Sequence, residues 1–101
     1  MITHQLKTLS QYWDAVKRGD KTFDVRRDDR GFQKGDTVEL IRYNGIGIAY
    51  RTELPDSTGP GGRYDKATYT LSREITYILT GGQFGIEPGY VVLALKKLEA
   101  R

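Results

Sequence analysis

The stretch from Gly19 to Asp36, GDKTFDVRRDDRGFQKGD, contains the side chains of this chain that are best suited to acid–base chemistry. Ten of its eighteen residues are charged, and the two signs are interleaved. Lys21, Asp24 and Arg26 stand close together in it. A carboxylate can take up a proton and an ammonium group can stabilise an oxyanion, so such a set can carry catalysis. The same residues could equally form a surface ion pair, which is typically worth about 0–1 kcal/mol and needs no function.

Several other chemistries lack the residues that they require. His4 is the only histidine and cysteine is absent, so the ligand sets of zinc hydrolases and zinc deaminases cannot be assembled. A Ser-His-Asp triad would have to use His4, which we expect near a mobile terminus. The segment GPGGR lacks the spacing of a phosphate-binding Walker loop. We therefore expect no metal and no cofactor, and any catalysis must rest on carboxylates, lysine, hydroxyls and backbone amides.

Length and composition indicate one globular domain over residues 1–101, with 38% hydrophobic and 29% charged residues. The net charge of +3 would suit a polyanion or a phosphorylated ligand, and it would equally serve solubility. Basic residues are dispersed among acids along the chain. No apolar run approaches the roughly 20 residues that span a bilayer, and the first thirteen residues, MITHQLKTLSQYW, lack the apolar core expected of a secretion signal. We expect a cytoplasmic monomer without contact to membranes.

The elements that would position the reactive residues begin with a short helix, for which Ser10 is the expected N-cap and Gly19 the expected end. After Gly19 the pattern changes to a period of two, which is typical of a strand. Thr22, Asp24 and Arg26 would share one face of this strand, whereas Phe23 and Val25 would face the core.

Four further strands are expected. Asn44-Gly45 predicts a hairpin turn, after which residues 46–54 should pair back antiparallel. The Gly/Pro-rich segment from 55 to 66 should be an exposed loop. The strand candidates are 37–43, 46–54, 67–80 with a bend near Ser72, and the apolar 90–98 as a central strand. Because closing a small sheet removes its exposed edges, the sequence predicts a mostly antiparallel, barrel-like α+β domain.

The reactive stretch resembles the ASCH domains of the PUA-like superfamily. The residues that carry this resemblance are Gly19, Lys21, Asp24, Arg26 and the pair Gly35-Asp36. The segment TYILTGGQFGIEPGYVVLAL looks like the last third of a small, often phage-associated branch of these domains. The resemblance implies a barrel of five to six strands with one or two flanking helices, a cleft beside the lysine-bearing strand, and a nucleoside or RNA as ligand.

Some small bacterial members that the chain resembles are metal-free amidohydrolases, which convert N4-acetylcytidine to cytidine and acetate. Their catalytic set is a lysine, a threonine three residues later and a glutamate in the C-terminal half. Lys21 matches the lysine, Asp24 stands in the place of the threonine, and Glu87 is the best match for the glutamate, with Glu74 as a substitute. A threonine could attack the substrate directly, whereas an aspartate in its place would more naturally activate water. Our hypothesis is therefore Asp24 or Glu87 as the general base and Lys21 as the oxyanion stabiliser or proton shuttle.

The expected substrate-binding residues surround this set. Thr22 is a fallback hydroxyl, and Arg26 would hold Asp24 or meet a phosphate. We expect one of Tyr43, Tyr77 and Tyr90 to contact a base. The alternative function is a non-catalytic module that binds RNA or a modified nucleotide in the same cleft. A third interpretation, an accessory protein acting on a host protein, has no direct support in the sequence.

Overall fold

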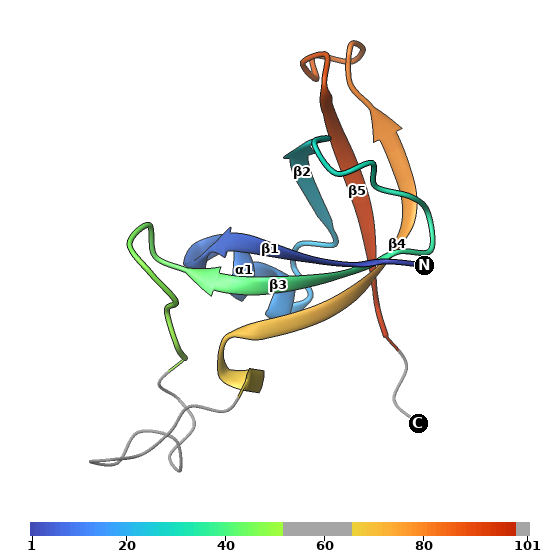
Figure 1. Cartoon of the computed structure of the whole chain (residues 1–101). Coiled ribbons are helices and arrows are strands. Elements are labelled where there is room, and N and C mark those ends of the chain that lie inside the picture. Colours follow the sequence, from blue (N-terminus) through green and yellow to red (C-terminus); the bar gives the residue numbers. More distant parts are fainter. Residues whose placement is uncertain (52–65, 99–101) are drawn as a thin grey trace, which may run out of the picture.

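The computed structural model describes residues 1–51 and 66–98. Within these residues the fold has one α-helix, five strands and one short 3-10 helix, and the colours of Figure 1 follow them along the chain. In chain order the elements are β1 (Thr3–Leu9), α1 (Ser10–Arg18), β2 (Phe23–Arg27), β3 (Thr37–Tyr43), η2 (Lys66–Thr68), β4 (Thr70–Thr80) and β5 (Tyr90–Lys97).

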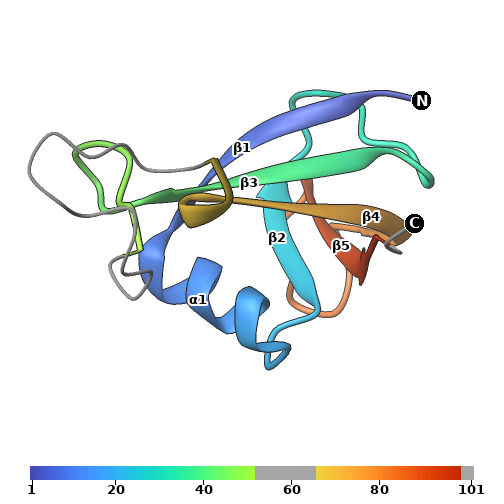
Figure 2. The same ribbon diagram turned by 90° about the horizontal axis from the view of Figure 1, so that it is seen from below.

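The five strands form one curled sheet in the order β1-β3-β4-β5-β2. The β1–β3 pair is parallel and the other three pairs are antiparallel, so the sheet is mixed. Figure 2 shows how the sheet curls, while α1 lies against β1 and β3. The fold is thus a small α+β half-barrel, as the sequence predicted, with one parallel pair in an otherwise antiparallel sheet.

The strand β1 corrects the expectation that the N-terminus is mobile. Thr3–Leu9 pairs with β3 over its whole length, from Thr3 opposite Thr37 to Leu9 opposite Tyr43. His4 in this strand is buried, and its ring meets Phe32 edge-on with the ring centroids 4.8 Å apart. The alternating burial of β1 is that of a strand with one face on the core.

The predicted strand 46–54 is wrong over its described part. After the turn at Asn44 and Gly45, a single antiparallel bridge joins Tyr43 and Ile48, and no strand continues to residue 51. The chain does turn here, with Gly45 at φ 97°, but the loop runs from Asn44 to Gly47, and the Asn44 amide donates to the Gly47 carbonyl at 3.2 Å. Residues 52–54 of that strand, and residues 55–65 of the predicted loop 55–66, lie outside the described residues, and Lys66 begins the short 3-10 helix η2.

The core lies between α1 and the concave face of the sheet. Trp13 is fully buried, and its indole Nε1 donates a hydrogen bond to the Leu40 carbonyl at 2.9 Å. The buried hydrophobic residues are Leu6, Trp13, Val16, Phe32, Val38, Leu40, Leu71, Ile75, Val91, Leu93 and Leu95. Trp13 therefore packs the helix onto the sheet.

The two ends of α1 match the sequence differently. Gly19 ends the helix in the left-handed conformation, at φ 88°, as predicted. Ser10 is the first helical residue instead of the N-cap, and its hydroxyl donates to the Tyr43 carbonyl at 3.1 Å. This bond serves the contact between the helix and β3 and leaves the helix without a side-chain cap.

The long strand β4 departs from regular pairing at a different place from the one expected. Its register against β5 shifts between Ile75 and Tyr77, whereas the sequence predicted a bend near Ser72. A bulge bends a strand and increases its twist. The two ends of β4 consequently run in different directions in Figure 1, one beside β3 and the other beside β5.

No helix in the described residues has the length and apolar character needed to cross a membrane.

Candidate functional site

The strand β2 turns its charged face inward, which corrects the predicted orientation. Asp24 is only 7% exposed, whereas Phe23 and Val25 are 45% and 52% exposed. The alternation was read correctly as a strand, but the two faces are exchanged. Burying a carboxylate is tolerated when cations contact it and satisfy its hydrogen bonds, and that is the arrangement here.

Two cations hold the carboxylate of Asp24. Lys21 Nζ lies 3.3 Å from Oδ1, and Arg26 Nε donates to Oδ2 at 2.5 Å. The side chains of Lys21 and Arg26 are 16% and 21% exposed, so both are largely withdrawn from water. The three side chains together carry one net positive charge. This cluster is more than a solvated surface pair, because its members are mostly buried.

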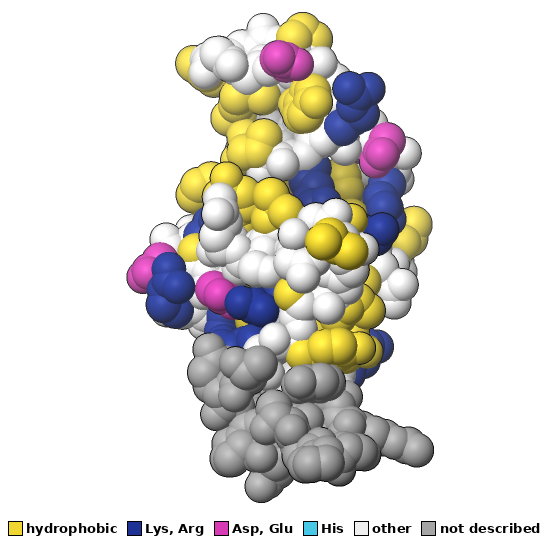
Figure 3. Space-filling view, turned by 90° about the vertical axis from the view of Figure 1, so that its left-hand side faces the viewer, with side chains coloured by type: hydrophobic (Ala, Val, Ile, Leu, Met, Phe, Trp, Pro, Cys, Tyr) yellow, Lys and Arg dark blue, Asp and Glu magenta, His cyan; other side chains and the backbone are white. Residues whose placement is uncertain are grey.

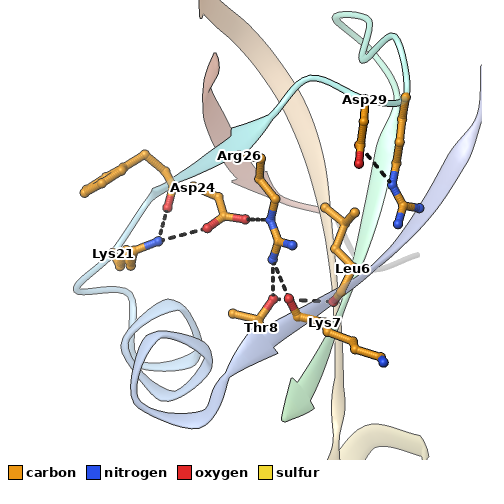
Figure 4. A network of polar contacts seen from close by, with 9 residues as sticks. Leu6, Lys7, Thr8, Lys21, Asp24, Arg26 and Asp29 are labelled. Carbon is orange, nitrogen blue, oxygen red and sulfur yellow. Dashed lines mark hydrogen bonds and ion pairs between the residues drawn. The ribbon is translucent and has the colours of Figure 1, made fainter. Parts of the chain in front are cut away.

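Arg26 extends this cluster across to the opposite edge of the sheet. Its Nη2 donates to the Lys7 carbonyl at 2.8 Å and to the Thr8 hydroxyl at 2.9 Å. Figure 4 shows the resulting chain of contacts from Lys21 through Asp24 and Arg26 to Thr8 on β1. The two edge strands of the half-barrel are thus joined by a side chain where no backbone ladder closes the sheet.

A hollow of about 410 Å³ lies beside the cluster and is called the Lys21 hollow here. The described residues that line it are Tyr12, Lys21, Phe23, Asp24 and Val25. Lys21 Nζ lies 5.5 Å from the ring centroid of Tyr12 and 4.8 Å from that of Phe23. It also donates to the Phe23 carbonyl at 2.6 Å. The hollow therefore places an ammonium group between two aromatic rings.

Glu87 lies in a second hollow, of about 340 Å³, which is called the Glu87 hollow. Its described lining is Val25, Gly85, Ile86, Glu87 and Tyr90, so it shares only Val25 with the Lys21 hollow. The hydrogen bond that Arg27 donates to Tyr90 raises the pKa of Arg27 above its ordinary value, and the charges of Asp29 and Glu87 add to this effect. Glu87 is exposed and belongs to the Arg27 end of β2, away from the Lys21 end.

Hydrophobic side chains are exposed on the face of the molecule that Figure 3 shows. Seen from the left of Figure 1, they extend from the top of the molecule, where the turn between β4 and β5 stands, through its middle to the lower right (Figure 3). Most of the Lys and Arg side chains on this face lie beside Asp or Glu (Figure 3). Opposite charges are thus mixed on the face in view, which does not form a continuous basic track.

The remaining predicted residues are spread over other parts of the fold. Tyr43 donates its hydroxyl hydrogen to the Gly45 carbonyl at 3.0 Å, and its ring lies 5.1 Å from Lys7 Nζ. Tyr77 is 62% exposed on β4. Glu74 pairs in register with Lys96. Of the three tyrosines considered for base contact, only Tyr90 lines one of the two hollows, and it lies beside Glu87.

Thr22 precedes β2 and is exposed. It lines neither the Lys21 hollow nor the Glu87 hollow within the described part of the chain. Its carbonyl accepts a hydrogen bond from the Leu95 amide at 2.8 Å. Thr22 therefore helps to anchor the Lys21 segment to β5.

Sequence reasoning missed three residues of this site: Tyr12, Phe23 and Thr8. Phe23 was expected to face the core, but 45% of it is exposed beside Lys21, as is 45% of Tyr12. The available signal was the position of Phe23 directly between Lys21 and Asp24 in the chain. Thr8 gave no signal, because its contact with Arg26 depends on how the two sheet edges approach each other.

No group of three or more His, Cys, Asp or Glu side chains that could hold a metal ion occurs within residues 1–51 and 66–98. The cluster around Asp24 instead combines one carboxylate with an ammonium and a guanidinium group. These groups can orient and polarise a polar ligand or move protons, and the aromatic rings of the hollow can stack on a flat one.

Comparison with protein families places most of the chain in a known family. A family model described as "Domain of unknown function (DUF3850)" matches residues 3–95. A search of curated proteins finds no significant relative. The matched range runs from the start of β1 into β5 and includes every residue of both hollows.

Proposed function

This chain belongs to the DUF3850 family, and we propose that it is a metal-free hydrolase that removes the acyl group from N4-acylated cytidine, as its resemblance to ASCH domains implies. N4-acetylcytidine would give cytidine and acetate. The observation that carries the proposal is the contact of Lys21 Nζ with Asp24 Oδ1, at 3.3 Å, in the wall of an aromatic hollow. A lysine and a carboxylate that meet beside a concave apolar surface are the usual signs of such a site.

Lys21 is the proposed oxyanion stabiliser. An ammonium group has three N–H donors, and the described residues accept from two of them, at the Phe23 carbonyl and at Asp24. The third can meet the carbonyl oxygen of the substrate amide. As that oxygen gains negative charge, the contact becomes stronger, which is how an oxyanion hole lowers a barrier. The Tyr12 and Phe23 rings hold the ammonium group in place by cation–π contact.

Asp24 is the proposed general base. It takes a proton from water while the water oxygen attacks the amide carbonyl carbon. The tetrahedral intermediate then breaks its bond to N4, and the same proton passes from Asp24 to the departing N4 amine. The second hydrogen of the water stays on the carboxylic acid product, so the reaction balances. A carboxylate has about four acceptor positions, so its contacts with Lys21 and Arg26 leave room for water.

The base role goes to Asp24 in preference to Glu87 or Glu74. Asp24 contacts the lysine directly, whereas Glu87 belongs to a hollow that shares only Val25 with the Lys21 hollow. Glu74 lies opposite Lys96, on the β4–β5 ladder. The cytosine ring would stack on Tyr12 or Phe23, since nucleobases are recognised on aromatic faces.

A second candidate is a binding module that holds RNA or a modified nucleotide in the same hollow without reaction. One observation favours it: both oxygens of Asp24 already contact cations, and only 10% of its side chain is exposed. A carboxylate held in this way can serve mainly to orient Lys21 and Arg26. The two candidates therefore share the ligand site and differ in whether Asp24 reaches water.

Incubation with N4-acetylcytidine, followed by the absorbance change on conversion to cytidine, separates the two candidates. We expect turnover by the native chain and a loss of at least about 100-fold in kcat for Lys21→Ala, the size of effect that one oxyanion donor contributes. Lys34→Ala removes an exposed lysine of the same type and is the matched control. If several N4-acylcytidines bind, as seen by NMR titration, but none is hydrolysed, the binding module replaces the hydrolase.

A further inference from the structure

A third hollow, of about 230 Å³, lies on the other side of the Lys21 segment and is called the basic hollow. Its described lining includes five cationic side chains and no acidic one: Lys17, Arg18, Lys21, Arg73 and Lys97. The rest of the lining is Val16, Gly19, Thr22 and Leu95. The whole chain carries a net charge of only +3, so this one hollow concentrates positive charge that the sequence disperses.

The strongest feature of the basic hollow is a pair of like charges. Arg73 on β4 and Lys97 on β5 stand directly opposite each other in the antiparallel register. Like charges in directly opposed positions destabilise a sheet. The next position along, Glu74 opposite Lys96, shows the usual arrangement of opposite charges. The Arg73–Lys97 pair therefore has no structural benefit of its own.

The cations of the basic hollow are also short of carboxylate partners. Arg18 pairs with Asp20 and Lys21 with Asp24, but Lys17, Arg73 and Lys97 make no ion pair with any residue in the described part of the chain. Arg73 is half-buried, and among the described residues its Nη1 donates to the Ser72 carbonyl alone, at 2.9 Å. Burial lowers the pKa of Arg73, because withdrawing this cation from water disfavours its charged form.

The end of α1 explains some of these residues, but not all. Lys17 and Arg18 lie in the last helical turn, where positive charge is favourable next to the helix dipole. Arg73 and Lys97 come from the sheet and have no such reason to be there. An anion placed among them would relieve their repulsion and supply the missing partner.

Lys21 lines both the basic hollow and the Lys21 hollow, and the chain passes from Thr22 in one to Phe23 in the other. We propose that the basic hollow binds the phosphate group of a nucleotide whose base occupies the Lys21 hollow. Drug-sized ligands fill pockets of about 300–1,000 Å³, so a volume of 230 Å³ suits one anionic group and 410 Å³ suits a base. This inference rests on the proposed function, because it adds a phosphate to the substrate named there.

NMR titration of the whole chain at constant ionic strength tests the basic hollow without any reaction. The probes are inorganic phosphate, cytidine, cytidine 5′-monophosphate and cytidine 3′-monophosphate. At least one monophosphate should bind about tenfold more tightly than cytidine or more, since charge-assisted contacts to phosphate are strong. Equal dissociation constants for cytidine and both monophosphates would overturn the proposal. Binding of a cytidine oligonucleotide without binding of either monophosphate would also overturn it, and would indicate a site for polymeric RNA.

Lys97→Gln and Lys96→Gln form a matched pair of variants, with neighbouring positions and the same change of charge. Only Lys97 lines the basic hollow. The advantage of the monophosphate over cytidine should disappear in Lys97→Gln and persist in Lys96→Gln, and an equal effect of the two would refute the site. Arg73→Gln should repeat the loss, and the melting temperature of each variant reports whether it folds.

Turnover separates the two proposals. If phosphate binding depends on Lys97 but no N4-acylcytidine is hydrolysed, the basic hollow stands and the hydrolase fails. If N4-acetylcytidine is hydrolysed but its 5′- and 3′-monophosphates show no higher kcat/KM, and inorganic phosphate does not bind, the hydrolase stands and the basic hollow fails.

Discussion

His4 Nε2 lies 2.9 Å from Asp36 Oδ2, and this buried pair fastens the first strand to the segment that enters β3. The Asp36 carboxylate also accepts the backbone N–H of Ile2 at 3.2 Å and that of Gln33 at 3.1 Å. Asp36 therefore connects the N-terminal segment with the loop that precedes β3. Asp36 of the Gly35-Asp36 pair, on which the family resemblance partly rests, therefore has a structural role: it holds the edge strand β1 in place.

Acid should weaken this connection. The hydrogen bond from His4 is the main cause that holds the pKa of Asp36 below its ordinary value of 3.8, and the amides of Ile2 and Gln33 add to it. A carboxyl group with a depressed folded-state pKa stabilises the fold above its ordinary pKa, and this contribution is lost as the pH falls through the folded value. We expect the melting temperature of the native chain to fall below about pH 4 more steeply than that of Asp36→Asn. Asp20→Asn, at an exposed acid, should keep the native slope.

Arg26 should be the main stabilising residue of the Lys21–Asp24–Arg26 cluster. Its guanidinium joins Asp24 on one sheet edge to Lys7 and Thr8 on the other. Arg26→Ala would leave a buried carboxylate with one cation fewer, at a cost of roughly 2–3 kcal/mol in the free energy of unfolding. Urea denaturation measures this change. Arg30→Ala, which removes an exposed arginine 3.7 Å from Asp29, should change it by less than about 0.5 kcal/mol.

Gly81 should tolerate no side chain. A Cβ atom there would lie 2.0 Å from the Glu87 carbonyl oxygen and 2.6 Å from that of Tyr90, so the turn between β4 and β5 would have to open. Gly81→Ala should reduce the free energy of unfolding by about 1–3 kcal/mol, as overpacking does. Gly47→Ala is the control, because a Cβ at Gly47 would meet nothing within 4 Å. Equal free energies of unfolding for the two variants would show that the carbonyl oxygens of Glu87 and Tyr90 can move away from residue 81 at little cost.

The two candidate bases can be separated by isosteric changes. Asp24→Asn should lower kcat for N4-acetylcytidine by about 100-fold or more, the contribution typical of a general base. Glu87→Gln should leave kcat within about twofold of the native value, since Glu87 belongs to the neighbouring hollow. Full activity of Asp24→Asn would end the role proposed for Asp24, and a selective loss in Glu87→Gln would transfer the base role to Glu87.

Local signals predicted several elements well. The alternation of TVELIRY matches β3, from Thr37 to Tyr43, and Gly19 ends α1 as expected. The strand β1 was missed because its hydrophobic alternation is weak. Two of its three buried residues, His4 and Thr8, are polar, and only Leu6 is hydrophobic. Residues 46–51 carry strand-like residue types but make only one bridge, since the N-terminal segment takes the position beside β3.

The sequence allowed us to predict which residues form the site, but not the direction in which their side chains point. Lys21 and Asp24 are three residues apart, so their contact was accessible from the sequence. The inward direction of Asp24 was not, because hydrophobic alternation alone places Phe23 and Val25 on the core side. Arg26 donates a hydrogen bond to the Lys7 carbonyl on β1, and this contact holds the charged face of β2 on the inner side of the sheet. The convergence of Arg73 and Lys97 also depends on strand register, which residue types do not reveal.

The register of β2 has a consequence for the order in which the molecule is made. Phe23 pairs with Ala94 and Arg27 with Tyr90, so the strand next to Lys21 finds its backbone partner only near the far end of the chain. During synthesis on the ribosome, β1, α1 and β3 can meet early, but β2 must wait until β5 has left the exit tunnel. Ligand binding should therefore be a late property of the nascent chain, and a ribosome-stalled chain that ends before Tyr90 should lack it.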